Sequence, residues 1–333
     1  MYGNYLLTGH TIHSKSIKAD TAQKYLLAAA TFLANFDTVP GRDGRKSHRT
    51  DKGLCNEIGV VMKEARRYES VPNRKEAFTL AMQQALRTEC KGESPDSLKS
   101  ALTDWFGAGI HGGFRKNEWC QENKYRKVGT FNKSPSGDPT AFTLDDIVFQ
   151  NASGTTISHR NAIANRSAIM RVTLRWRWQK NGTRMETKGY SRNIHDIKLD
   201  TVEAWLNIVE RYYRIMPKNA LGEPSTTLPV AVFKDNKTVH NITDTMVELI
   251  MRALAKSVYG ITAIKELNKF TCHSIRVGAC CILQAAGASP DYIKKKLRWN
   301  SDSWMIYTRD LCILAHQHNE IMFNESKRTN QRW

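Results

Sequence analysis

Hydrophobic residues recur along this 333-residue chain at two different spacings, and each spacing predicts a kind of element. Between about Thr21 and Asn35, apolar side chains follow one another every three to four residues, which predicts an amphipathic helix capped by Asp20. The same spacing predicts helices over residues 54–68, 78–90, 96–108, 201–215 and 243–257, and mostly helix from residue 272 onward.

A spacing of two residues marks one segment in the middle of the chain. Met170, Val172, Leu174, Trp176 and Trp178 alternate with polar or basic residues, which predicts a half-buried strand. Asn181-Gly182 predicts a tight turn into a return strand over residues 183–188. The fold class expected from these patterns is mainly α with a small antiparallel β-sheet, an α+β protein.

Two polar segments organise the chain into domains. Residues 41–53 are basic and contain glycine, so they predict a loop that could touch phosphates. Residues 69–76 interrupt the helical pattern with a proline and several charges. We therefore expect a small helical domain over residues 1–71 and a larger domain over residues 72–333, with a loop at 124–138 in the latter.

The charge of the chain suggests its partner. A formal net charge of +18 and a sequence pI of about 9.6 favour a polyanion, with nucleic acid the first candidate and an anionic membrane surface the second. The apolar stretch at 25–36 is shorter than the roughly 20 residues that a bilayer needs, and the first residues lack the pattern of a secretory signal. We expect no membrane span and no secretion.

Three other motifs are better explained as structure than as chemistry. The seven cysteines are scattered and form no C-x2-C pair, which excludes a zinc ribbon or a disulfide scaffold and fits a reducing compartment. His316 and His318 lack a carboxylate or cysteine partner, so we expect a surface pair and no metal site. The G-x-G-x-x-G of residues 107–112 follows a helical pattern instead of a strand, so we expect it to end a helix and allow close packing, not to bind a dinucleotide.

The predicted strand carries an unusual density of positive charge. Residues 160–192 contain nine Lys and Arg against one acid, Glu186. A solvated edge that resists aggregation is one explanation, but the density and the neighbouring tryptophans favour contact with DNA phosphates. The DNA-binding candidates are Arg171, Arg175, Arg177, Arg184 and Lys188, together with Arg45, Lys46 and Arg49 of the first loop.

The segment 272–309 concentrates the reactive side chains. His273 and Arg276 lie three residues apart at the start of a predicted helix, so they share a face. Gly287 can end that helix, and Ser289-Pro290 can begin the next one. Trp299 follows the second helix, and Tyr307 comes eight residues later.

This order of H-x-x-R, Trp and Tyr resembles the tyrosine recombinase (phage integrase) family. GGFRKNEW is similar to the family's first box, with Arg115 and Glu118 at its Arg and acid positions, and QKNG is similar to its β-hairpin lysine, at Lys180. The resemblance covers about residues 72–310; the first 70 residues are similar only in style to the family's core-binding domain. The runs RWNSDSWMIYTRD and VPNRKEAFT most resemble recombinases of eukaryotic mobile elements of the Crypton and retroelement type.

The resemblance implies a phosphodiester chemistry with a role for each residue. Arg115 and Arg276 would hold the non-bridging oxygens, with His273 and the Trp299 N–H beside them. Tyr307 would be the nucleophile and Lys180 the general acid, while Glu118 would pair with a neighbouring cation. The covalent 3′-phosphotyrosyl intermediate conserves the bond energy, so we expect neither ATP, metal nor other cofactor.

The resemblance also implies partners and leaves two alternatives open. We expect double-stranded DNA as the partner and a tetramer on two DNA sites, weaker or monomeric without DNA. The apolar segment 311–323 either docks on a neighbouring protomer or caps its own domain. The location would be the nucleus in a eukaryotic host and otherwise the cytoplasm. The alternatives are a type IB topoisomerase-like enzyme and a DNA-binding protein whose catalysis has decayed.

Overall fold

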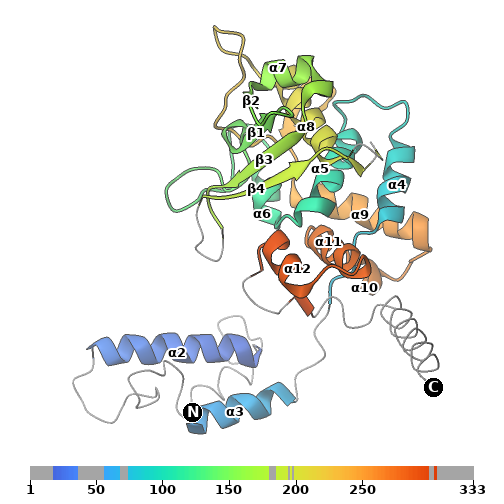
Figure 1. Cartoon of the computed structure of the whole chain (residues 1–333). Helices are drawn as coiled ribbons and strands as arrows, with labels where there is room; N and C mark the ends of the chain where they lie inside the picture. The colour runs from blue at the N-terminus through green and yellow to red at the C-terminus, as the bar shows by residue number, and fades with distance from the viewer. Residues whose placement is uncertain are drawn as a thin grey trace, which may run out of the picture. The chain divides into compact units, whose positions relative to one another are not determined.

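A computed structural model of the chain describes residues 18–36, 56–67, 74–179, 185–193, 196, 199–299 and 304–305, with the backbone alone for 30–36, 56 and 57. The chain divides into two compact units, Met1–Asn73 and Arg74–Trp333. Figure 1 shows the two units, coloured by residue number.

The first unit contains two described helices that pack on each other. Helices α2 (Ala19–Phe36) and α3 (Asn56–Arg67) confirm the predicted helical segments, and Ala22 and Met62 are buried between them. Asp20 was expected to cap α2 but lies within its first turn, where its Oδ1 accepts a hydrogen bond from Arg66 Nε at 2.8 Å. The carboxylate therefore joins the two helices.

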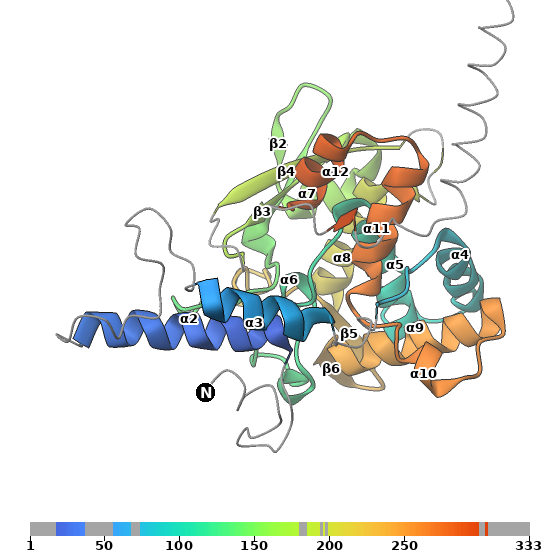
Figure 2. The same ribbon diagram turned by 90° about the horizontal axis from the view of Figure 1, so that it is seen from below.

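The second unit is built mainly of helices, most of which the hydrophobic spacing predicted. The longer ones are α4 (Leu80–Glu89), α5 (Leu98–Gly112), α8 (Thr201–Ile215), α9 (Asp244–Tyr259), α11 (Ser274–Ala285) and α12 (Pro290–Leu297). The short ones are α6 (Lys116–Trp119), α7 (His159–Ala164) and α10 (Ile264–Leu267), with 3₁₀ turns at Asn123–Tyr125, Leu144–Asp146 and Arg166–Ala168. Helix α5 contacts α4, α8 and α11 and is the centre of the helical part (Figures 1 and 2).

The glycines of α5 act differently from the prediction. The helix was expected to end near residue 108, but it continues to Gly112 and ends at Gly113, whose φ of +55° is left-handed. A Cβ at Gly109 would lie 2.6 Å from Ile275 Cγ2, so the absence of a side chain allows α11 to approach. The predicted close packing is confirmed, and α4 precedes this helix where a dinucleotide site would need a strand.

A four-stranded antiparallel sheet, in the order β2-β1-β3-β4, covers one side of α8. Its strands are β1 (Ile147–Gln150), β2 (Thr156–Ile157), β3 (Arg171–Trp176) and β4 (Glu186–Ser191). Val172, Leu174 and Trp176 are buried, which confirms the predicted alternation within β3, whereas Met170 and Trp178 lie outside the strand and are half-buried. The short strands β1 and β2 were not predicted. A separate hairpin pairs β5 (Val232–Asp235) with β6 (Thr238–Asn241).

The β3–β4 hairpin departs from the predicted register. A two-residue turn at Asn181-Gly182 would place Trp176 opposite Thr187, but its partner is Glu186. Met185, directly before β4, has a left-handed φ of +58°. The return strand therefore covers residues 186–191 instead of 183–188; the tip itself, 180–184, lies outside the described residues.

An aromatic cluster fixes the segment between α5 and α6. Trp105 stacks on Trp119 with ring centroids 5.3 Å apart and meets the edge of Trp205 at 5.2 Å. Phe114 also contacts Trp105, with centroids 6.3 Å apart. Because Phe114 and Trp119 bracket α6 and are buried, Arg115 between them has a fixed backbone position.

Candidate functional site

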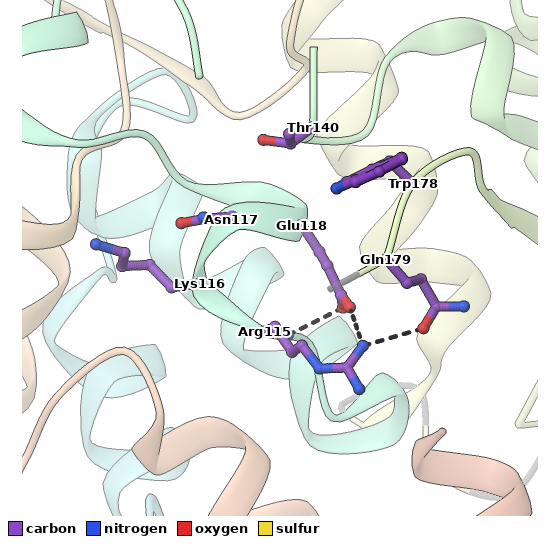
Figure 3. Close-up of a pocket in the computed structure, with 7 residues that line it drawn as sticks. All are labelled: Arg115, Lys116, Asn117, Glu118, Thr140, Trp178 and Gln179. Atoms are coloured by element: carbon purple, nitrogen blue, oxygen red, sulfur yellow. Dashed lines mark hydrogen bonds and ion pairs between the residues drawn. The ribbon is translucent and has the colours of Figure 1, made fainter. Parts of the chain in front are cut away.

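Arg115 and Glu118 form a compact pair at the start of α6. The Arg115 backbone N–H donates to Glu118 Oε2 at 2.9 Å, and its Nη1 donates to Glu118 Oε1 at 3.1 Å. The first bond satisfies an amide that the start of a helix leaves without a backbone partner. The pairing of Glu118 with a neighbouring cation, expected from the sequence, is therefore present (Figure 3).

A second cation, Arg298, holds the other side of Glu118. Its Nη2 lies 2.6 Å from Glu118 Oε2, its Nη1 donates to the carbonyl of Gly112 at 3.0 Å, and the guanidinium stacks on Trp176 at 4.0 Å. Arg298 ends α12 with a left-handed φ of +58°. Sequence reasoning passed over this residue, although a basic residue at the predicted end of a helix was an available signal.

The backbone carbonyl of Arg298 brings the two predicted phosphate-binding arginines together. It accepts hydrogen bonds from Arg115 Nη2 at 3.1 Å and from Arg276 Nη2 at 3.4 Å. Arg276 also donates from Nη1 to the Gly113 carbonyl at 2.6 Å. Two guanidiniums from segments far apart in the sequence therefore share one acceptor, and Arg276 is 1% exposed.

His273 and Trp299 complete the neighbourhood of Arg276. His273 directly precedes α11, and burial together with the charges of Arg276, Lys75 and Arg115 lowers its pKa to about 4. The imidazole is therefore neutral at pH 7. The half-buried Trp299 ring stacks on the Arg276 guanidinium, whose Cζ lies 4.3 Å from the ring centroid.

The charge at this site is strongly unbalanced. Burial alone would raise the pKa of Glu118, but the charges of Arg298, Arg115 and Arg276 outweigh it and hold that pKa below its ordinary value. One carboxylate thus faces three guanidiniums, so the site has an excess of positive charge. An anion entering beside Arg115 and Arg276 would be attracted.

Gln179, which the sequence placed on the polar side of the strand, is buried and links Arg115 to the hairpin. Its Oε1 accepts from Arg115 Nη1 at 3.0 Å, and its Nε2 donates to Glu186 Oε2 at 2.5 Å. Glu186 Oε1 lies 2.8 Å from the ammonium of Lys188, one of the DNA-binding candidates. The base of the hairpin is therefore connected to the arginine pair through three successive contacts.

The three arginines of β3 and its extension differ in their contacts. Arg171 is exposed, while Arg175 and Arg177 both face Asp146, at 3.6 Å and 2.8 Å from its Oδ1. Arg177 Nη2 also donates to the Thr143 hydroxyl at 3.0 Å. Arg171 is thus accessible to a partner, whereas Arg177 has a structural contact; their DNA binding stays a prediction.

The remaining candidates lie outside the described residues. These are Tyr307, Lys180, Arg184, Arg45, Lys46 and Arg49. The site that the structure describes therefore consists of Arg115, Glu118, His273, Arg276 and Trp299 from the sequence prediction, with Arg298 and Gln179 added by the fold.

A cavity of about 530 Å³ opens beside this site. Its lining consists of Arg115, Lys116, Asn117, Glu118, Thr140, Trp178 and Gln179 (Figure 3).

The described residues contain no group of three or more His, Cys, Asp or Glu placed to hold a metal ion. Within the same residues, no helix combines the length and apolar character needed to cross a bilayer.

No family model matches the chain, and no curated protein matches it in sequence. Solved structures of the Tn1549 transposon integrase with DNA are similar to it. One complex with circular intermediate DNA gives a TM-score of 0.45 and 11% identity, covering 92% of this chain and 80% of the other. A complex with transposon right end DNA gives 0.35 and 12%, covering 90% and 87%. Likenesses of this size say nothing about chemistry, which follows from the contacts of the chain's own residues.

Proposed function

We propose that the chain is a DNA strand-transfer enzyme of the tyrosine recombinase kind, which cuts and rejoins DNA through Tyr307. The observation that carries the proposal is that Arg115 and Arg276 share the carbonyl oxygen of Arg298, with His273 beside them. A phosphoryl group under attack gathers negative charge on its non-bridging oxygens. Two guanidiniums fixed side by side match that charge and stay protonated at any physiological pH.

The reaction exchanges one phosphoester for another. The Tyr307 oxygen attacks phosphorus while the bond to the 5′ oxygen breaks, and the phenolic proton passes to neutral His273. The departing oxygen takes a proton from Lys180, giving a 5′ hydroxyl and a 3′-phosphotyrosyl link. Attack by the 5′ hydroxyl of another strand reverses the steps, so no external energy source is needed.

The described residues that precede Tyr307 in the sequence support its assignment as the nucleophile. Trp304, three positions earlier, is buried among Ala279, Cys280 and Leu297, and its carbonyl lies 3.8 Å from Cys280 Sγ. Cys280 lies one helical turn beyond Arg276 on α11. The chain therefore passes close to the helix of the second arginine shortly before the proposed nucleophile.

The wider proposal follows the resemblance found in the sequence. We infer a tetramer that pairs two duplexes, in the service of a mobile element of eukaryotic type, acting in the nucleus of such a host. The domain before residue 72 would also contact the DNA.

A covalent-adduct assay tests the proposal. The full chain is incubated with a pool of nicked, random-sequence suicide duplexes, from which the short strand beyond the cleavage point diffuses away. We expect a protein–DNA adduct that survives denaturant. The strand that diffuses away should carry a free 5′ hydroxyl. The matched control is Tyr307→Phe, which keeps the ring and lacks the nucleophilic oxygen. An adduct in the control, or none in the wild type despite DNA binding, would overturn the proposal.

A further inference from the structure

A loop of twenty residues begins and ends beside Arg115. The basic loop, residues 121–140, leaves α6 at Gln121, whose N–H donates to the Ile242 carbonyl at 2.9 Å. It returns at Thr140, which lines the cavity that contains Arg115. Two residues later, the Phe142 N–H donates to the Glu118 carbonyl at 2.9 Å. Both ends are thus attached to the helix that carries the candidate site.

A buried amide fixes the interior of the basic loop. Asn241 Nδ2 donates to the carbonyls of Tyr125, Lys127 and Thr130, at 2.9, 3.2 and 2.9 Å. The Asn241 backbone N–H donates to the Arg126 carbonyl at 2.9 Å, and the side chain is 1% exposed. A loop held in this way has already lost its backbone entropy, so a partner would not need to order it.

The basic loop presents more positive charge than its own carboxylates neutralise. Lys124, Arg126, Lys127 and Lys133 are all exposed, against Glu122 and Asp138. Glu122 pairs with Lys124 at 2.8 Å. Arg126 and Lys127 make no ion pair with any residue that the structure describes. Like charges gathered on a fixed loop repel one another, and an anionic partner relieves that repulsion.

We propose that the basic loop binds the backbone phosphates of duplex DNA next to the proposed cleavage point. The inference rests on the proposed function and adds a contact surface to it. Lys and Arg on a preformed backbone are the groups that neutralise phosphates without reading sequence. A membrane surface fits less well, because the larger apolar side chains of the loop, Tyr125, Val128 and Phe131, are half-buried.

Salt dependence measures the phosphate contacts directly. Each lost contact lowers the magnitude of the negative slope of log affinity against log salt by about 0.9. The test variant is Lys124→Gln/Arg126→Gln/Lys127→Gln. The control, Lys218→Gln/Lys256→Gln/Lys265→Gln, removes the same charge from exposed sites after α8, in α9 and in α10. Binding of a random-sequence duplex is followed by fluorescence anisotropy over a salt series, and thermal unfolding by circular dichroism checks that both variants fold.

We expect the magnitude of the slope to fall by about 2 to 3 in the loop variant and by less than about 1 in the control. Equal slopes in the two variants would overturn the inference. A loss of binding to phosphatidylserine vesicles with unchanged DNA binding would overturn it as well, in favour of a membrane surface.

The adduct assay separates this inference from the proposed function. We expect the loop variant to need a higher protein concentration than wild type for half-maximal adduct, because the loop holds DNA. If the wild type forms no adduct, the proposed function fails, while the salt slope still reports on the loop. If the adduct forms and the slopes are equal, the function stands and the loop proposal fails.

Discussion

The Glu118 carboxylate and the Arg298 guanidinium form a buried ion pair, with Nη2 and Oε2 2.6 Å apart and side chains 6% and 1% exposed. The pair joins α6 to the end of α12. Because Arg115 begins α6 and the Arg298 carbonyl accepts from both Arg115 and Arg276, this contact sets the distance between the two candidate phosphate-binding arginines.

Removing one partner of this pair should destabilise the fold strongly. Glu118→Gln leaves Arg298 charged and buried without a countercharge, which typically costs about 3–5 kcal/mol. We expect that loss in the free energy of unfolding, measured with urea at pH 7. In the double variant Glu118→Gln/Arg298→Met, part of the loss should be recovered. Strictly additive effects of the two single changes would contradict a coupled pair.

The lowered pKa of His273 predicts a pH-dependent stability. The folded pKa is about 4, whereas the unfolded value is about 6.5. Between these values the unfolded chain binds more protons, so stability falls as pH drops from about 6.5 toward 4. At pH 4 the cost approaches roughly 3 kcal/mol. Relative to His273→Gln, the wild type should lose this amount between pH 7 and 4, as measured by urea unfolding. An imidazole NMR titration near the unfolded value would refute the prediction.

The hairpin offers two lysines as the general acid, and a modified substrate distinguishes them. Lys180→Ala should slow cleavage by roughly 10²–10⁴. A bridging 5′-thiolate leaving group needs no proton, so such a substrate should restore the rate. Lys188→Ala is the matched control, because the Lys188 ammonium is held 2.8 Å from Glu186. If the thiolate rescues only the Lys188 variant, the acid is Lys188 and the assignment of Lys180 is wrong.

Cleavage should proceed in EDTA. Among the described residues no His, Cys, Asp or Glu cluster is arranged for a metal, and the guanidiniums of Arg115 and Arg276 already supply positive charge. We expect the adduct yield with 10-fold excess chelator over any added divalent ion to equal that without it. A strict requirement for Mg²⁺ in the cleavage step would contradict the mechanism.

The sequence by itself determined the elements whose signals are local. Helix α8 runs from Thr201 to Ile215, the predicted bounds, because its apolar spacing and its cap Asp200 lie within a few residues of each other. The alternation of β3 and the start of α12 at Ser289-Pro290 could also be predicted from the sequence, since each depends on adjacent residues. Arg115, His273 and Arg276 were predicted as site residues from the resemblance of their motifs to the tyrosine recombinase family.

Only the tertiary structure decided what those residues contact. The carbonyl of Arg298 has no signature in the sequence, because every residue carries a carbonyl and only the left-handed end of α12 directs this one toward two arginines. The sequence pattern predicted that Gln179 is exposed, but in the fold its amide bonds Arg115 at one end and Glu186 at the other. Gly109 lies inside α5 at a point where a side chain would clash with Ile275 of α11. Contacts between distant segments arise only when the chain packs, and periodicity along the sequence carries no record of them.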